Sequence, residues 1–431
     1  MFSETFRGGI HPNDHKEQTK NVAVKKIKPG EILTYVLSQG GRGCTPLVQK
    51  GDRVLKGQMI ADSKEFVSAP IHASVSGTVE KIEKVITQKG DMADAIIVRN
   101  DFAEESVELH PIRPEGYVTK EELIKEVRRA GIVGMGGAGF PTHVKLATDK
   151  KIDTIIVNGS ECEPYLTSDY RVLVEKPEAM IDGLDIVIHA YGVKNGIIAI
   201  EDNKKDVVPS LTKKLKSSMK IKVLKTKYPQ GSEKQLIYAV TGRIVPEGGL
   251  PADVGVLVLN VDTMASISRA IRRGLPITRR TVTISGKAVK EPGNYFVRIG
   301  MSFEEIFEAA GGFTEKPAKL ITGGPMMGGA IYSLKIPFTK TNSGILALTE
   351  EELGTKDEVP CIRCGRCVEA CPMGLMPVAL TKCIREKDWE QAKKSGLMSC
   401  IECGCCAYTC PSDRNPVAVI RRGKNAIRSG K

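Results

Sequence analysis

This sequence of 431 residues has few aromatic residues and no long apolar run. Phe, Trp and Tyr make up 5% of it, with a single Trp, which argues against stacking platforms for nucleic-acid bases. The longest apolar stretch, residues 181–200, is interrupted by Asp185, His189, Lys194 and Asn195, so it cannot supply the ~18 apolar residues of a membrane-spanning helix. The first residues, MFSETFRGGIHPNDHK, also lack the apolar core of a signal peptide. We therefore expect a chain that remains in the cytoplasm.

The overall composition is that of a folded, multidomain protein. Hydrophobic residues make up 41% and charged residues 26%, and at about 150 residues per domain the length suggests roughly three domains. The formal charge is +12, and such an excess often indicates nucleic acid or acidic membranes. Anionic cofactors would also be balanced by this positive charge. We therefore expect no nucleic-acid partner.

Cysteines are concentrated near the end of the chain, where ten of the twelve lie between Cys361 and Cys410. They form the pattern CxxCxxCxxxCP twice, with a period of 39 residues. This pattern is typical of two 4Fe-4S clusters in which the fourth cysteine of each run binds the other cluster. The predicted ligand sets are Cys361, Cys364, Cys367 and Cys410 for cluster 1, and Cys400, Cys403, Cys406 and Cys371 for cluster 2.

The alternative for these cysteines is a pair of zinc sites. Tetrahedral zinc needs two CxxC pairs per ion and has no use for the further cysteine followed by proline. Cys383 and Cys405 lie outside the repeated pattern and are interpreted as bystander thiols. Cys44 and Cys162 are interpreted as small buried hydrophobic residues.

A glycine-rich segment, GMGGAGFP, occupies residues 134–141. Glycines let backbone N–H groups approach a phosphate or a flat ring, although a plain tight turn is the alternative. Beyond it, apolar runs at 152–157, 197–200, 221–224 and 256–259 alternate with predicted helices at 177–191 and 206–217. This rhythm predicts a largely parallel sheet, in which ligands lie at the carboxyl ends of the strands. NGSECEP, from Asn158, and NVDT, from Asn260, follow two of these strands.

These motifs, together with YPQGSE at 228–233, resemble the flavin subunit of respiratory complex I and its relatives. In that family they hold FMN and NADH. The resemblance implies FMN contacts at Gly134, Gly136, Gly137, Gly139, Lys145, Asn158, Ser160, Glu161, Gly231 and Asn260, and nicotinamide-nucleotide contacts at Phe140, Glu163 and Glu233. Three residues depart from the family pattern: Met135 replaces Arg, Cys162 replaces Ser, and Ser232 replaces Glu.

The two ends of the chain extend the resemblance. Residues 51–61 and 68–82 resemble the halves of a biotinyl- or lipoyl-like β-sandwich, and residues from about 281 to 335 resemble a β-grasp module of the SLBB type. In this order, with FRGGIHP at the start and both cysteine runs, the chain resembles the RnfC family. We expect an α/β multidomain fold with a β-sandwich at 1–110, an FMN/NAD(H) domain at 111–275, an SLBB-like β-grasp domain at 276–345 and a ferredoxin-like two-cluster domain at 346–431.

The resemblance implies an oxidoreductase subunit that exchanges hydride between NAD(H) and FMN and single electrons through two 4Fe-4S clusters. It implies a peripheral position at the cytoplasmic face of the cell membrane, with the other Rnf subunits as partners and ferredoxin reached indirectly. Two alternatives remain open. One is an RnfC-like cobalamin reductase of a microcompartment. The other is an electron-relay subunit with a degenerate flavin site, suggested by Met135 and Ser232.

Overall fold

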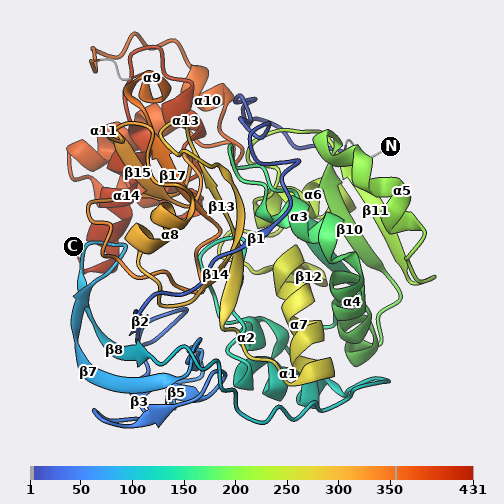
Figure 1. Ribbon diagram of the computed structural model, residues 1–431. Helices are drawn as coiled ribbons and strands as arrows, with labels where there is room; N and C mark the ends of the chain where they lie inside the picture. The colour runs from blue at the N-terminus through green and yellow to red at the C-terminus, as the bar shows by residue number, and fades with distance from the viewer. Residues whose placement is uncertain (1–3, 355–356, 431) are drawn as a thin grey trace.

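The computed structural model describes residues 4–354 and 357–430. Figure 1 shows an N-terminal β-sandwich, a central α/β domain, a third sheet and a helical C-terminal domain packed together in one body. The mixed α/β multidomain class expected from the sequence is confirmed. In the part of the chain that the structure describes, no helix is both long and apolar enough to span a membrane.

The N-terminal sandwich consists of two small antiparallel sheets. The first has the order β2-β8-β7-β4 and the second β3-β5-β6. Their bounds are β2 Ile32–Val36, β3 Thr45–Pro46, β4 Arg53–Val54, β5 Met59–Asp62, β6 Ile71–His72, β7 Gly77–Ile86 and β8 Met92–Asn100. Leu33, Ile60 and Val98 are fully buried, as expected for strands that turn one face to a shared core.

The central domain contains a four-stranded parallel sheet of order β11-β10-β9-β12. The strands are β9 Thr154–Gly159, β10 Gly196–Glu201, β11 Met219–Leu224 and β12 Val256–Asn260. They match the four predicted apolar runs. Ile155 and Ile156 belong to separate hydrophobic clusters, because helices cover both faces of the sheet.

Helices of very different lengths surround this sheet. They are α1 Lys120–Arg129, α2 Thr142–Leu146, α3 Ser168–Glu175, α4 Pro177–Tyr191, α5 Val208–Thr212, α6 Glu233–Thr241 and α7 Val261–Arg273, with short 3-10 turns at Asp202–Val207 and Pro251–Val254. The helix predicted at 177–191 is confirmed. The one predicted at 206–217 is wrong in length, since α5 ends at Thr212. Only Leu211 of α5 is buried, so little apolar surface stabilises further turns.

The third sheet has the order β1-β14-β13-β17-β15-β16. Its strands are β1 Lys25–Lys26, β13 Arg279–Ser285, β14 Gly293–Arg298, β15 Lys319–Thr322, β16 Gly329–Ile331 and β17 Gly344–Leu348, accompanied by α8 Phe303–Ala309 and followed by α9 Glu350–Leu353. The boundary expected after residue 345 falls inside β17, which is hydrogen-bonded to β13 and β15. This sheet therefore includes a few residues assigned to the C-terminal domain by sequence.

The C-terminal domain repeats one helical pattern twice, in step with the cysteine repeat: α10 and α11 in the first copy correspond to α13 and α14 in the second. Its helices are α10 Arg366–Glu369, α11 Pro377–Arg385, α12 Trp389–Lys394, α13 Cys405–Tyr408 and α14 Pro416–Arg428, with a 3-10 turn at Leu397–Ser399. Pro377 and Pro416 each open a helix. At this position the missing N–H of proline breaks no helical hydrogen bond. The domain has its own small core, which includes Leu380, Leu397 and Ile420.

The N-terminal segment before β1 bridges two domains. The N–H of Gly9 donates to the carbonyl of Ala370 at 2.9 Å, and Ile10 exchanges backbone hydrogen bonds with Tyr228. Farther along, the ammonium group of Lys16 donates to the carbonyls of Glu161 and Glu163, both at 2.9 Å. This segment therefore joins the central domain to the cysteine-rich domain (Figure 1).

Candidate redox site

A hydrogen bond between its two ends closes the glycine-rich loop, and one side of the loop is free of side chains. The N–H of Gly134 donates to the carbonyl of Phe140 at 2.8 Å, which closes the loop before α2. A Cβ at Gly137 would meet no atom within 4 Å, whereas a Cβ at Gly136 would lie 2.6 Å from Nδ2 of Asn260. Gly139 has a φ of +69°, which a side chain would strain. Backbone N–H groups can therefore approach a ligand here without side chains in the way.

The carboxyl ends of β9 and β12 lie against this loop. Asn158 and Asn260 are direct neighbours in the register of the two strands. The amide of Asn158 donates to the carbonyl of Gly231 at 2.8 Å, and Oδ1 of Asn260 caps α7. We call the space bounded by residues 134–140, Asn158 and Asn260 the glycine cradle. The fold thus gathers three motifs that lie far apart in the sequence.

Two charged residues from different helices face each other beside the cradle. Nζ of Lys145, in α2, lies 2.5 Å from Oε1 of Glu233, at the start of α6, and also 3.1 Å from the carbonyl of Val258. Phe140 is 46% exposed and can offer a ring face to a ligand. A predicted flavin contact and a predicted nucleotide contact are thereby brought together.

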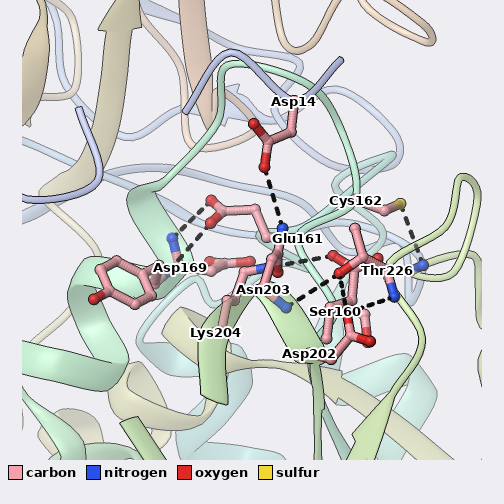
Figure 2. A network of polar contacts seen from close by, with 12 residues as sticks. Asp14, Ser160, Glu161, Cys162, Asp169, Asp202, Asn203, Lys204 and Thr226 are labelled. Carbon is pink, nitrogen blue, oxygen red and sulfur yellow. Dashed lines mark hydrogen bonds and ion pairs between the residues drawn. The ribbon is translucent and has the colours of Figure 1, made fainter. Parts of the chain in front are cut away.

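The two glutamates of the NGSECEP motif have separate structural partners. The carboxylate of Glu161 accepts the N–H groups of Asp169 and Tyr170 at the start of α3, at 2.9 and 3.2 Å (Figure 2). The carboxylate of Glu163 accepts the N–H groups of Met326 and Met327, between β15 and β16, at 3.0 Å each. Burial raises the pKa of Glu163 to about 7, although these N–H groups oppose the shift. Glu163 therefore ties the central domain to the third sheet.

Ser160 and Met135 bear on whether FMN fits the cradle. Oγ of Ser160 is buried and has no hydrogen-bond partner within the described residues, as expected of a ligand-binding group. Met135 is fully buried, and its Sδ lies 3.7 Å from the hydroxyl of Ser266. Its side chain packs into the core, so the replacement of Arg leaves the open side of the loop free. The residues present fit the flavin.

The cysteines predicted for cluster 2 line one small cavity. Its wall includes Cys371 from the first run together with Cys400, Cys403 and Cys406 from the second. Apolar side chains such as Leu380 and Ile420 complete the wall. The crossing of Cys371 into the second set is thus present in the fold, and four thiolates around an apolar cavity suit an iron–sulfur cluster. Cys405, which the sequence places outside the two ligand sets, also lines this cavity.

The cysteines predicted for cluster 1 lie nearer the surface. Cys361 and Cys364 are exposed, whereas Cys367 and Cys410 are half-buried. The N–H of Val359 donates to the carbonyl of Ser412 at 3.1 Å, which brings the segment before Cys361 next to the one after Cys410. Among residues 4–354 and 357–430, no three His, Cys, Asp or Glu side chains are grouped as ligands of a single metal ion.

Segment 228–235 connects the cradle to the cavity of the second set, because its Gly231 accepts a hydrogen bond from Asn158 while other residues of the segment bond to the cavity wall. The hydroxyl of Tyr228 donates to the carbonyl of Cys403 at 2.8 Å, and the amide of Gln235 donates to the carbonyl of Pro372 at 3.2 Å. On the other side, the N–H of Gly231 lies 3.2 Å from Sγ of Cys162. Sequence reasoning gave no role to Tyr228 or Gln235, although Tyr228 opens the recognised motif YPQGSE.

Family comparisons cover most of the chain. Residues 4–103 match the RnfC barrel sandwich hybrid domain, 127–269 the Nuo51 FMN-binding domain, 281–329 the SLBB domain and 360–414 the 4Fe-4S dicluster domain. The corresponding component of the proton-translocating ferredoxin:NAD(+) oxidoreductase complex of Clostridium ljungdahlii is 46% identical over 397 residues, which are 91% of this chain and 87% of the relative. The chain belongs to the RnfC family. The resemblance found in the sequence is confirmed.

Other members of the RnfC family agree. The counterpart from the Na(+)-translocating complex of Acetobacterium woodii is 43% identical, over 91% of this chain and 90% of the relative. The counterpart from the ion-translocating oxidoreductase complex of Rhodobacter capsulatus is also 43% identical, over 92% and 78%. A solved NAD+-reducing [NiFe]-hydrogenase has a similar fold, with a TM-score of 0.54 at 20% identity; the match covers 71% of this chain and 62% of the hydrogenase chain.

Proposed function

We propose that this chain is the RnfC electron-transfer component of an ion-translocating ferredoxin:NAD+ oxidoreductase. Its relatives are named as components of such complexes, and the flavin and dicluster domains supply the matching cofactors. The observation that carries the proposal is that segment 228–235 contacts both sites. Its Gly231 accepts a hydrogen bond from Asn158 of the glycine cradle, and its Tyr228 and Gln235 donate to Cys403 and Pro372 in the wall of the cysteine cavity.

When bound, FMN supplies the exchange of a hydride for single electrons, and the two clusters carry these electrons one at a time. The chain itself binds and orients. The glycine cradle presents backbone N–H groups, and Lys145, Asn158 and Asn260 surround the flavin position. Phe140 and Glu233 would receive the nicotinamide nucleotide, with Glu233 released from Lys145. The carboxylate of Glu163, the third predicted nucleotide contact, is instead held by the N–H groups of Met326 and Met327.

The burial of the two cysteine sets implies an order of electron transfer. Cluster 2 would lie next to the flavin, because its cavity contacts the turn at 228–231. Cluster 1 would face a partner subunit, since Cys361 and Cys364 are exposed. The family relationship favours a peripheral position at the cytoplasmic face of the membrane, where the other subunits of the complex would receive or deliver electrons and ferredoxin would be reached through them.

Anaerobic purification followed by NADH titration tests the proposal. We expect FMN and about eight irons per chain, with NADH bleaching the flavin and then reducing the clusters. Cys371→Ala should remove cluster 2 and abolish reduction of the remaining cluster, while NADH still bleaches FMN. The matched variant Cys364→Ala should remove cluster 1 and leave the other cluster reducible.

Three results would contradict parts of this proposal. A wild-type chain whose flavin NADH cannot bleach would indicate the relay alternative. Reduction of the remaining cluster in Cys371→Ala at the wild-type rate would reverse the proposed order. Zinc in place of iron and sulfide would rule out electron transfer through the cysteine-rich domain.

A further inference from the structure

Asp169 lies at the edge of the glycine cradle, although no recognised motif includes it. It occupies the first turn of α3, and its Oδ2 accepts a hydrogen bond from Nδ2 of Asn260 at 2.6 Å. That same Nδ2 lies next to Gly136, since a Cβ on this glycine would stand only 2.6 Å away. Only the side-chain amide of Asn260 therefore separates the carboxyl group of Asp169 from the glycine-rich loop.

Three carboxyl groups gather at this point, and only two of them have partners that stabilise a negative charge well. Asp262, in α7, pairs with Arg269 at 3.1 Å and with Arg280, in β13, at 3.0 Å. Glu161 accepts two backbone N–H groups of α3 (Figure 2). Within the described residues, Asp169 forms no ion pair; the nearby Arg280 is engaged by Asp262.

These surroundings favour the protonated form of Asp169. Burial raises its pKa well above the ordinary value, and the charges of Glu161 and Asp262 add to the shift; the Asn260 amide and Arg280 oppose it. The pKa of Asp262 is instead lowered, because the charges of Arg269 and Arg280 outweigh the effect of burial. Of the three, Asp169 is also the one that retains exposed surface, whereas Glu161 and Asp262 are buried.

We propose that Asp169 is a further FMN-contacting residue, which meets the cofactor as a neutral carboxyl group and donates a hydrogen bond to one of its acceptor atoms. The inference rests on the proposed function, because it assumes that the cradle binds FMN. A carboxylate at this position would repel the negative charge that a flavin gains on reduction. A neutral acid instead supplies an O–H donor to that charge.

The affinity for FMN as a function of pH tests this role in the full chain. The purified protein is freed of FMN and titrated with it between about pH 6 and about pH 9, with flavin fluorescence as the readout. Once Asp169 ionises, the wild-type dissociation constant should rise by about tenfold per pH unit relative to Asp169→Asn. Asp169→Asn keeps a neutral donor, so its affinity should stay within about threefold of the low-pH wild type.

Two further variants separate this role from a structural one. Asp169→Ala lacks any donor and should bind FMN about tenfold more weakly than Asp169→Asn at every pH, without the wild-type slope. Asp149→Asn removes an exposed carboxyl outside the cradle and should follow the wild type. Iron content and cluster absorbance confirm that each variant is folded.

The inference is overturned if Asp169→Asn keeps the wild-type pH slope, or if the wild type and both Asp169 variants bind FMN equally at every pH. If the wild type binds FMN at no pH, the proposed function fails together with it. If the wild type binds FMN and NADH bleaches it while the variants remain indistinguishable, only the role of Asp169 fails.

Discussion

Gly183→Ala tests whether helix packing controls the glycine cradle. Gly183 lies in the middle of α4, where a Cβ would stand 2.0 Å from the carbonyl oxygen and 2.6 Å from the carbonyl carbon of Met264 in α7. Carbon atoms in contact lie about 3.5–4.0 Å apart, so the two helices would have to separate by about 1 Å. The overlapping atoms belong to the backbone of Met264, which, unlike a side chain, cannot move away by changing rotamer. We therefore expect a loss of folding stability at the upper end of the range for overpacked cores, about 3 kcal/mol. Alanine recovers about 1 kcal/mol of helix propensity, which leaves a net loss of about 2 kcal/mol.

The same displacement should reach the cofactor. Asn260 caps α7 one turn before Met264, so movement of α7 moves a predicted flavin contact. We expect weaker FMN binding, by about tenfold, together with a lower unfolding midpoint in denaturant. Gly329→Ala is the control, because a Cβ there makes only an ordinary contact at 4.0 Å with Thr322. Wild-type stability and FMN affinity in Gly183→Ala would refute the packing argument.

Three other variants probe the contacts between domains and the buried charges. Tyr228→Phe leaves the carbonyl of Cys403 without its donor and should cost about 1–2 kcal/mol, measured by denaturant unfolding; an unchanged midpoint would show that water replaces the hydroxyl. Arg280→Met leaves the buried Asp262 with Arg269 alone and should cost about 3–5 kcal/mol; a loss below about 1 kcal/mol would contradict the buried-pair reading. Because burial raises the pKa of Glu163 from 4.5 to about 7, the folded chain holds a proton there that the unfolded chain releases earlier. The stability gained from this proton is fully present below about pH 4.5 and is lost by about pH 7, a change of about 3 kcal/mol that Glu163→Gln should remove from the stability–pH profile.

Local patterns predicted the central domain well where the apolar signal was strong. The four strands and α4 follow from runs of buried residues, and Thr119 and Glu122 form a capping box at the start of α1. The helix predicted through residue 217 failed because a charge-rich segment with helical propensity lacks apolar surface to pack. Pattern alone could not reveal this, since packing decides how far such a helix extends.

The sequence by itself determined the chemistry of the chain. The repeated spacing of the cysteines predicts two crossed ligand sets, and the ordered flavin motifs predict an FMN domain, because ligand type and spacing along the chain are local properties. Only the tertiary structure decided which cysteine set lies nearer to the cradle, that Met135 points into the core, that Glu163 binds the third sheet and that Asp169 forms no ion pair with any described residue. These features depend on burial and on contacts between residues far apart in the sequence, and no local pattern contains that information.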